Sequence, residues 1–271
     1  KTMLENVRAK TPLVHNITNY VTVNDVANVL LAAGGSPIMS DDADDVEDIT
    51  SICGGLNINI GTLNKNTIPS MFLAGKKANE LGHIVLLDPV GAGASRLRTD
   101  TANRLMREVR FDAVRGNISE IKTLCTGSGT TKGVDADAVD AVTEANLDDG
   151  VQLVKAFAQK TGCIIAVTGA IDLVSDGERC WCIRNGRAEM SRITGTGCQL
   201  SALMTAFLVA NPDRKLDAAA AAVCMMGLAG EIGWANMQPG DGNSTYRNRI
   251  IDAIFNMTGD ALEEGAKYEL R

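Results

Sequence analysis

The chain carries Gly195-Thr196-Gly197-Cys198 directly in front of an apolar run, Gln199–Ala210, and this order predicts a glycine turn that opens a helix. Glycine lets a backbone approach a ligand closely and adopt positive φ. The first amides of a helix have no partner within it and carry the positive end of its dipole. Gly195, Thr196 and Gly197 are therefore expected to bind a phosphate and to stabilise charge during its transfer. The alternative is a plain tight turn followed by a buried cysteine.

The thiol of Cys198 is expected at the mouth of this turn. A thiol beside a helix N-terminus has a lowered pKa, because the dipole favours the thiolate. We therefore predict a lowered pKa for Cys198 and include it among the catalytic candidates.

Outward from this turn, short apolar runs alternate with amphipathic segments. The expected strands are Leu13–Asn16, Ser36–Met39, Leu56–Ile60, Ile84–Leu87, Ala113–Val114 and Cys163–Thr168. The expected helices between them are Val21–Ala33, Asp44–Ile52, Thr67–Glu80, Thr99–Glu108, Ser119–Leu124 and Asp149–Lys160. Continuous apolar strands separated by helices indicate a parallel sheet that is covered on both faces. The sequence thus predicts an α/β fold.

The later part of the chain is expected to differ. Ile171–Ser175 and Arg179–Arg184 predict a hairpin that turns at Ser175-Asp176-Gly177. After Thr194 the pattern predicts helices only, namely Gln199–Ala210, Leu216–Ala235 and Tyr246–Met257. No Pro/Ser-rich linker interrupts the sequence, so residues 1–271 are expected to form a single domain.

Six of the expected strands are followed by polar or glycine-rich residues. In an open α/β sheet the ligand crevice lies beyond the carboxyl ends of the strands, so these six ends predict one shared site. The sequences concerned are Asn16-Ile17-Thr18-Asn19, Met39-Ser40-Asp41-Asp42, Asn59-Ile60-Gly61-Thr62, Asp88-Pro89-Val90-Gly91, Arg115-Gly116-Asn117 and Thr168-Gly169.

Two carboxylates in these segments are candidate magnesium ligands. Asp88 directly follows a strand, and a carboxylate there is able to hold Mg²⁺ through water, although it also suits a capping role. Glu120 is the second oxygen donor that we assign to magnesium. The spacing from Asn117 to Glu120 equally fits a capping box, and the two roles are compatible.

Three further residues point to a nucleotide. Arg115 offers a permanent positive charge to phosphates, Asn117 precedes a helix, and Thr168 offers a hydroxyl beside the bare backbone of Gly169. The chain has no G-x-x-x-x-G-K-[ST] motif and no kinase catalytic-loop signature. A glycine cluster alone is a weak phosphate signal, so we expect a loop at Gly127-Ser128-Gly129 with Lys132-Gly133.

Composition excludes several classes of function. The net charge is −7, the isoelectric point is about 5.0, and only 4% of residues are aromatic, which argues against nucleic acid and against an anionic membrane surface. The seven cysteines are odd in number and include no C-x-x-C pair, so reduced thiols are expected, with Cys180 and Cys182 in the core. We expect no signal peptide and no apolar run long enough to span a bilayer, which predicts a cytoplasmic protein.

Blocks of the sequence together resemble one family. The chain is similar to the hydroxyethylthiazole kinases of the ribokinase-like superfamily from about Pro12 to Ile254. The blocks are Pro12-Leu13-Val14-His15-Asn16-Ile17-Thr18-Asn19-Tyr20-Val21, Ser36-Pro37-Ile38-Met39, Asn59-Ile60-Gly61-Thr62-Leu63, Asp88-Pro89-Val90-Gly91-Ala92-Gly93-Ala94, Arg115-Gly116-Asn117 with Glu120, and Gly195-Thr196-Gly197-Cys198.

The resemblance implies a three-layer α/β/α fold and an ATP-dependent kinase. The substrate would be the primary alcohol of 4-methyl-5-(2-hydroxyethyl)thiazole, phosphorylated in thiamine salvage, with Mg²⁺ required. It also implies a cytoplasmic homotrimer with active sites at the subunit boundaries. The alternatives are a kinase for another heterocyclic alcohol, such as hydroxymethylpyrimidine, and a non-catalytic thiazole-binding protein.

The resemblance also assigns roles to individual residues. Thiazole contacts are implied for Asn19, Val21, Met39 and Gly195, ATP contacts for Arg115 and Thr168, and a role in organising metal and phosphates for Asp88 and Glu120. A thioether such as that of Met39 packs well against a flat sulfur heterocycle.

The chain departs from the wider superfamily at Cys198, where sugar kinases place an aspartate base. A free thiol with a pKa near 8.5 is only a few per cent ionised at neutral pH. We therefore infer that catalysis depends on phosphate positioning and charge neutralisation, in keeping with a loose phosphoryl-transfer transition state. A second departure is the segment Gly240–Tyr246, which is shorter in some relatives.

Overall fold

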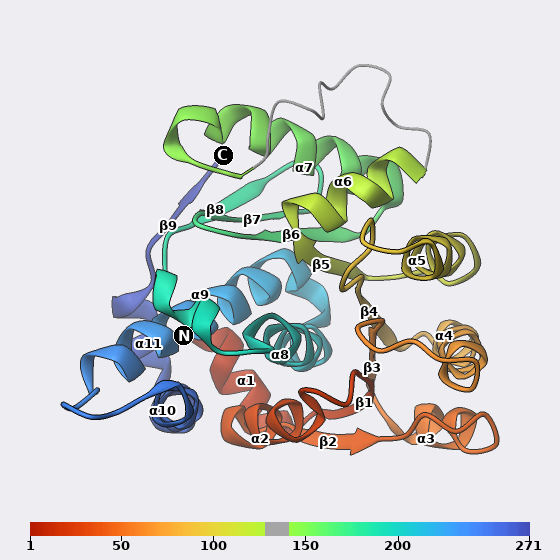
Figure 1. Cartoon of the computed structure of the whole chain (residues 1–271), viewed down its shortest axis with the longest axis horizontal. Coiled ribbons are helices and arrows are strands. Elements are labelled where there is room, and N and C mark those ends of the chain that lie inside the picture. Colours follow the sequence, from red (N-terminus) through yellow and green to blue (C-terminus); the bar gives the residue numbers. More distant parts are fainter. Residues whose placement is uncertain (128–140) are drawn as a thin grey trace.

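The computed structural model describes residues 1–127 and 141–271. The described residues form one nine-stranded sheet in the order β2-β1-β3-β4-β5-β6-β7-β8-β9 (Figure 1). Its strands are β1 Leu13–Ile17, β2 Ser36–Met39, β3 Gly55–Asn59, β4 Ile84–Asp88, β5 Ala113–Asn117, β6 Ile164–Thr168, β7 Asp172–Ser175, β8 Cys180–Ile183 and β9 Tyr268–Leu270.

The first six strands pair in parallel and the last three antiparallel, which confirms the predicted mostly parallel sheet. The predicted hairpin is β7–β8. It turns at Gly177, where φ is +99°, and Oδ1 of Asp176 accepts hydrogen bonds from the amides of Glu178 and Arg179.

The strand register brings the polar strand ends together. Asn59 at the end of β3 lies beside Asp88 of β4, and Asn117 of β5 lies beside Thr168 of β6. Because parallel strands end at the same edge, residues that are 29 to 51 positions apart in sequence share one rim.

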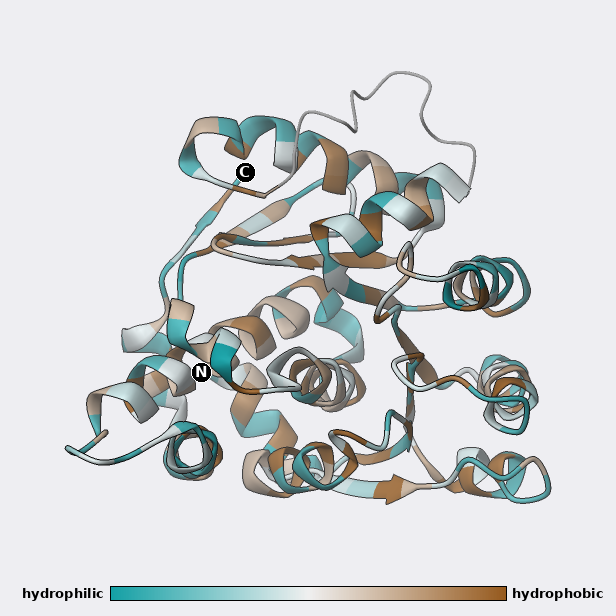
Figure 2. Ribbon diagram, in the orientation of Figure 1, coloured by the Kyte–Doolittle hydropathy of each residue, from teal (hydrophilic) through white to brown (hydrophobic). Residues whose placement is uncertain are grey.

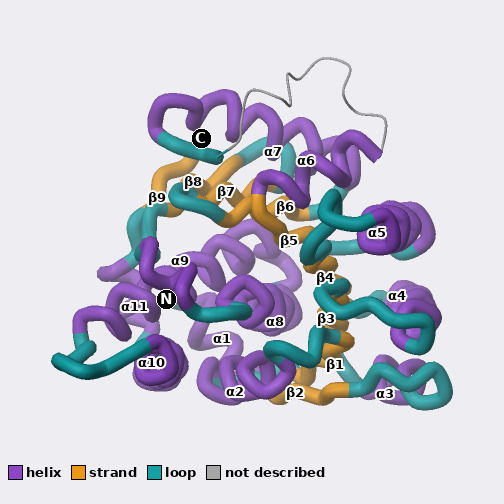
Figure 3. The backbone as a smooth tube through the Cα atoms, viewed as in Figure 1, coloured by secondary structure: helices purple, strands orange, loops and turns teal. Residues whose placement is uncertain are grey.

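Helices cover both faces of the sheet (Figures 1 and 3), which confirms the three layers. One face is covered by α3 Val46–Ile52, α4 Thr67–Leu81, α5 Arg96–Glu108, α6 Ile118–Gly127 and α7 Leu147–Thr161. The other carries α1 Thr2–Lys10, α2 Val23–Ala33, α8 Thr196–Ala210, α9 Lys215–Ala235, α10 Asn243–Asn256 and α11 Gly259–Gly265.

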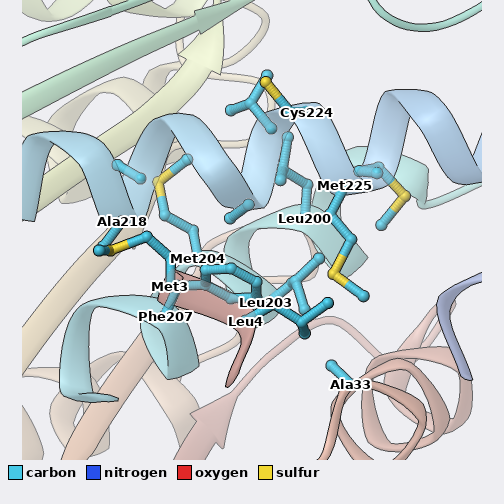
Figure 4. Packing of buried hydrophobic residues seen from close by; sticks show 14 of the residues in the cluster. Met3, Leu4, Ala33, Leu200, Leu203, Met204, Phe207, Ala218, Cys224 and Met225 are labelled. Carbon is cyan, nitrogen blue, oxygen red and sulfur yellow. The ribbon is translucent and has the colours of Figure 1, made fainter. Parts of the chain in front are cut away.

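Each face has its own apolar core. On the α8 side, Leu203 and Phe207 pack among Leu4 of α1 and Met225 of α9 (Figure 4). Hydrophobic colouring extends around α8 and α9, whereas α5 is largely hydrophilic toward solvent (Figure 2). A helix that is apolar all round must be enclosed, and this enclosure holds α8 in place beneath the rim.

Helix α9 corrects one expectation. With the turn before it, Pro212–Ala235 is 24 residues long and contains an 18-residue stretch with a mean hydropathy of 1.4, so it does reach the length and composition of a membrane span. However, 72% of its apolar stretch is buried inside the fold, among α1, α8, α10 and α11. The apolar character of α9 is thus accounted for by its place in the core.

Other differences concern the ends of the chain. The pattern after Thr194 was expected to contain helices only, but β9 adds an antiparallel edge strand to β8. This prediction was wrong because β9 is held by backbone bonds and has no apolar run to reveal it.

Helix α1 was not predicted, although Met3, Leu4 and Val7 form its buried face. The loop expected at Ser128, Gly129, Lys132 and Gly133 lies outside the described residues, while Gly127 ends α6.

Candidate active site

The predicted strand ends meet beside the start of α8. A cavity of about 600 Å³ opens there. Arg115 of β5 and Thr168 of β6 line it, together with Gly169 in the following turn and Asp172 at the start of β7. The rest of the wall comes from residues between 185 and 191 and from parts of α8 and α9. This volume falls within the usual range for a small-molecule or cofactor site.

The glycine turn caps α8 as predicted. Gly195 has φ +82°, and a Cβ added there would lie 2.0 Å from Cγ2 of Thr22, so the position excludes other residues on two grounds. The helix starts at Thr196, three residues earlier than expected, and its first bond runs from the Gln199 amide to the Gly195 carbonyl at 2.9 Å. The three preceding amides are the orphan donors of a helix start.

Gly197 serves a different purpose from Gly195. A Cβ on Gly197 would lie 2.5 Å from Nη2 of Arg115 and 2.9 Å from its Cζ, so the missing side chain lets the guanidinium lie directly on the helix start. The positive end of α8 and the arginine charge are thereby concentrated at one point of the cavity wall. An anion such as a phosphate is favoured at such a point.

Asp88 is completely buried beneath this point. Its Oδ2 accepts hydrogen bonds from Ser201 Oγ at 2.7 Å, Arg115 Nη1 at 3.1 Å and Asn59 Nδ2 at 3.2 Å. Within the described residues, Oδ1 has no hydrogen-bond partner. Burial raises the pKa of Asp88 to about 6, against the opposing effects of Arg115 and Ser201.

Arg115 joins the acidic residue to the nucleotide candidate Thr168. Arg115 is buried, its guanidinium pairs with Asp88, and Nη2 donates to Thr168 Oγ1 at 2.8 Å. A buried charge of this kind is tolerated because it is paired and hydrogen-bonded. Arg115 therefore lies at the rim beside Thr168, and its contact with ATP stays a prediction.

Glu120 and Asn117 form the capping box that the spacing allowed. The Glu120 amide donates to Asn117 Oδ1 at 2.9 Å, and the Asn117 amide donates to Glu120 Oε2 at 2.8 Å. Glu120 Oε1 also accepts from the Gly91 amide at 2.9 Å, which ties the loop after β4 to α6. Each carboxylate oxygen still has a free lone pair, so capping and metal binding remain compatible. Asn117 is outside the cavity lining among the described residues.

The oxygen donors at the rim are of the kind that suits magnesium. Over residues 1–127 and 141–271 there is no group of three or more His, Cys, Asp or Glu that could enclose an ion. Mg²⁺ is commonly held by one or two carboxylates together with waters and substrate phosphates. The unpartnered Oδ1 of Asp88 and the oxygens of Glu120 suit that pattern.

The substrate-side residues lie across α8 from the cavity. Asn19 Nδ2 contacts Cys198 Sγ at 3.2 Å and Asn59 Oδ1 at 3.1 Å. Met39 packs against the apolar cluster that includes Cys198. Val21, by contrast, is 57% exposed. One network of contacts thus runs from Cys198 through Asn19, Asn59, Asp88 and Arg115 to Thr168.

The prediction of a lowered thiol pKa for Cys198 was wrong. Burial raises its pKa, and the nearby charge of Asp88 raises it further, whereas Asn59, Arg115 and Asn19 act in the opposite direction. Loss of solvent is the largest of these effects, so the net change in the pKa is upward. The thiol is even less ionised at neutral pH than a free cysteine, which strengthens the inference that it is not a strong base.

Two residues at the site were not predicted from the sequence: Ser201 donates to Asp88, and Asp172 lines the cavity. Asn59 was predicted only as one of the strand ends at the rim, and the structure shows that it links Asn19 to Asp88. Asp172 Oδ1 accepts from the Gly169 amide at 2.8 Å, and burial raises its pKa to about 7. The position of Ser201, three residues after Cys198 on one helix face, was the available sequence signal for it.

The segment Gly240–Tyr246 is anchored away from this site. Asp241 pairs with Arg249 at 3.1 Å, and the Tyr246 hydroxyl donates to the Gly230 carbonyl at 2.8 Å. The cavity lining, as far as the described residues go, includes none of its members.

Comparison with known proteins gives a consistent result. The profile described as the hydroxyethylthiazole kinase family matches residues 4–260. Proteins named hydroxyethylthiazole kinase include one from Clostridium acetobutylicum, 58% identical over 269 residues (99% of this chain and 98% of that protein). Another, from Clostridium beijerinckii, is 50% identical over 268 residues (98% of this chain and 95% of that protein).

Solved structures agree. The solved structure of hydroxyethylthiazole kinase protein from Pyrococcus horikoshii OT3 superposes on this chain with a TM-score of 0.89 at 32% sequence identity. The superposition covers 100% of this chain and 98% of that protein. The pyridoxal kinase from Staphylococcus aureus, solved in complex with ADP, superposes with a TM-score of 0.62 at 15% identity. The superposition covers 96% of this chain and 97% of the pyridoxal kinase chain, and at this identity it shows a shared fold alone.

Proposed function

Because the chain belongs to the hydroxyethylthiazole kinase family, we propose that the rim around Asp88, Arg115 and the start of α8 is its phosphoryl-transfer site. The enzyme phosphorylates the hydroxyethyl group of 4-methyl-5-(2-hydroxyethyl)thiazole in thiamine salvage. The observation that carries the site assignment is the continuous network from Cys198 to Thr168, because it joins the implied thiazole side to the implied ATP side.

ATP is assigned to the 600 Å³ cavity, with its phosphates toward Arg115 and Gly197. The arginine and the orphan amides of α8 face the same point, so they stabilise the charge on the transferred group. Thr168 orients the arginine by accepting its hydrogen bond.

Asp88 and Glu120 would hold Mg²⁺, largely through water. When bound, the ion neutralises phosphate charge and aligns the nucleotide. Asp88 would contribute its unpartnered Oδ1, and Glu120 would contribute from the first turn of α6, where its contact with Gly91 holds it against the loop after β4.

The thiazole alcohol is placed between Asn19, Met39 and the Gly195 turn, with Cys198 beside its hydroxyl. Asn19 is held rigidly, because its Oδ1 accepts bonds from both the amide and the hydroxyl of Thr22. A fixed amide and a thioether give one polar and one apolar contact, which suits a small heterocycle.

Substitution of Cys198 tests whether a base is needed. We expect Cys198→Ala to lower kcat by less than about tenfold, below the contribution of about 10²–10⁴ that a general base makes. Cys198→Asp should keep or raise kcat, because Asn19 is placed to donate to a carboxylate and more of that group is ionised. Steady-state kinetics check both; loss of all turnover in the two variants would mean that the thiol is indispensable.

Glu120→Gln separates metal binding from capping. Glutamine keeps one acceptor for the capping bond to the Asn117 amide but loses the bond to the Gly91 amide, so the melting temperature should fall modestly. The loss of charge should raise the Mg²⁺ concentration for half-maximal rate about tenfold. Glu108→Gln on the exposed face of α5 is the control. A collapse of the melting temperature without a change in Mg²⁺ dependence would support capping alone.

We further propose a single-domain, cytoplasmic homotrimer with active sites at the subunit boundaries. Tyr20 and Val21 support this, because they are 78% and 57% exposed beside the site and a partner subunit would cover them. Sedimentation analysis tests the assembly: a monomer at assay concentration would contradict it.

A coupled ADP-release assay tests the function directly. The thiazole alcohol and hydroxymethylpyrimidine are compared with and without Mg²⁺, and we expect Mg²⁺-dependent ADP release with the thiazole. Faster turnover of the pyrimidine would reassign the substrate. Calorimetry that shows thiazole binding without ADP release would instead indicate a binding protein.

A further inference from the structure

We infer that Ser201 is a positioning residue for the metal site: its hydroxyl fixes the Asp88 carboxylate so that Oδ1 is presented to the divalent cation. The inference rests on the proposed function, since it takes Asp88 as a magnesium ligand. It adds a residue of α8 that lies one turn below the anion site.

The two carboxylate oxygens of Asp88 differ in their hydrogen-bond partners. Three donors from three different elements converge on Oδ2, namely Ser201 from α8, Arg115 from β5 and Asn59 from β3. The Ser201 contact is the shortest of them, at 2.7 Å. Oδ1 has no hydrogen-bond partner among the described residues, although it is fully buried. A buried carboxylate oxygen without a partner is costly, which points to a further group that satisfies it.

The direction of the Ser201 hydroxyl is unusual for a helix interior. Serine and threonine hydroxyls within helices commonly donate to the carbonyl four residues earlier. Thr205, the next turn of α8, does so and donates to the Ser201 carbonyl at 2.9 Å. Ser201 instead donates across to β4. Both side chains are fully buried, so the difference lies in the partner and not in exposure.

The bond also couples two halves of the site. Cys198 and Ser201 occupy the same face of α8, three residues apart, and Asp88 lies 113 positions away in sequence. The helix start that faces the phosphate is thus held in register with the carboxylate that faces the metal. Partners that orient metal ligands in this way typically change metal affinity by about 10–100-fold when they are removed.

The test measures metal binding, independently of turnover. Mn²⁺ is titrated into the full-length enzyme with saturating ADP, and free Mn²⁺ is followed by electron paramagnetic resonance. We expect Ser201→Ala to raise the Mn²⁺ dissociation constant about tenfold or more. Thr205→Val is the matched control, because it removes a buried hydroxyl from the same helix that bonds only its own backbone. Its Mn²⁺ affinity should equal that of the wild type.

Further measurements keep the outcomes separate. ADP affinity in EDTA should be the same in Ser201→Ala and wild type, and thermal unfolding confirms that each variant is folded. Ser201→Cys keeps a weak donor and should bind Mn²⁺ with intermediate affinity, so it replaces the alanine variant if that one does not fold. Equal Mn²⁺ affinity in wild type and the Ser201 variants would overturn the inference alone. A wild-type enzyme that binds no Mn²⁺ with ADP would overturn the proposed metal site as well.

Discussion

Replacement of Asp88 by asparagine should lower kcat on the order of 10³-fold, the upper part of the range seen when a single charge-stabilising group is lost from an active site. The side chain is fully buried, so no solvent is available to take over its role. Asparagine keeps the size of the residue but removes the charge that Arg115 pairs with and that the metal would require.

The same change should also destabilise the fold. Arg115 would remain buried without its counter-charge, and removal of one partner of a buried pair costs about 3–5 kcal/mol in the free energy of unfolding. Denaturant unfolding measures this loss, while Mn²⁺ binding and kcat are measured under conditions where the variant is folded.

Asp112→Asn is the control for Asp88→Asn. Asp112 also pairs with a cation, Lys215, at 2.6 Å, but it precedes β5 and lies at the opposite edge of the sheet from the site. Its replacement should lower stability and leave kcat unchanged. If Asp88→Asn retained more than a tenth of the wild-type kcat, Asp88 would have no direct role in transfer.

Gly197→Ala should lower kcat/KM for ATP about 100-fold, the scale of loss from a displacement of about 1 Å in a catalytic group. The backbone of Gly197 is helical, so alanine is accepted there and even favours the helix. The added Cβ, however, would meet the Arg115 guanidinium at 2.5 to 2.9 Å. The arginine cannot yield without breaking its contacts with Asp88 and Thr168.

Steady-state kinetics with varied ATP measure this effect, and Gly242→Ala is the matched control. Gly242 lies at a helix start as well, as the N-cap of α10, and a Cβ there would meet nothing within 4 Å. We expect wild-type kinetics from the control. Unchanged ATP kinetics in Gly197→Ala would show that Arg115 need not lie against the helix start.

The strand ends of the site could be predicted because they depend on periodicity and on one topological rule. A parallel sheet brings its carboxyl ends to one edge, so Asn59, Asp88, Arg115 and Thr168 had to be neighbours once the strands were identified. The register confirms this for Asn59 and Asp88 in particular.

Features that depend on burial could not be predicted in the same way. The sequence shows that Cys198 precedes a helix but not that the thiol is enclosed, so the sign of its pKa shift was predicted incorrectly. Asp172 was not recognised because its role follows from a cavity wall built partly by α9, some 50 positions later. β9 escaped prediction because edge pairing is made by backbone groups, which every residue possesses.

The long sequence separations within the network have a consequence for how the enzyme matures. Its bonds link residues 179, 40, 29, 27 and 53 positions apart, drawn from both ends and the middle of the polypeptide. Contacts between residues far apart in sequence form late in folding, because the entropy of closing the intervening loops must be lost first. We therefore expect competence for phosphoryl transfer to appear only once the parallel sheet is complete.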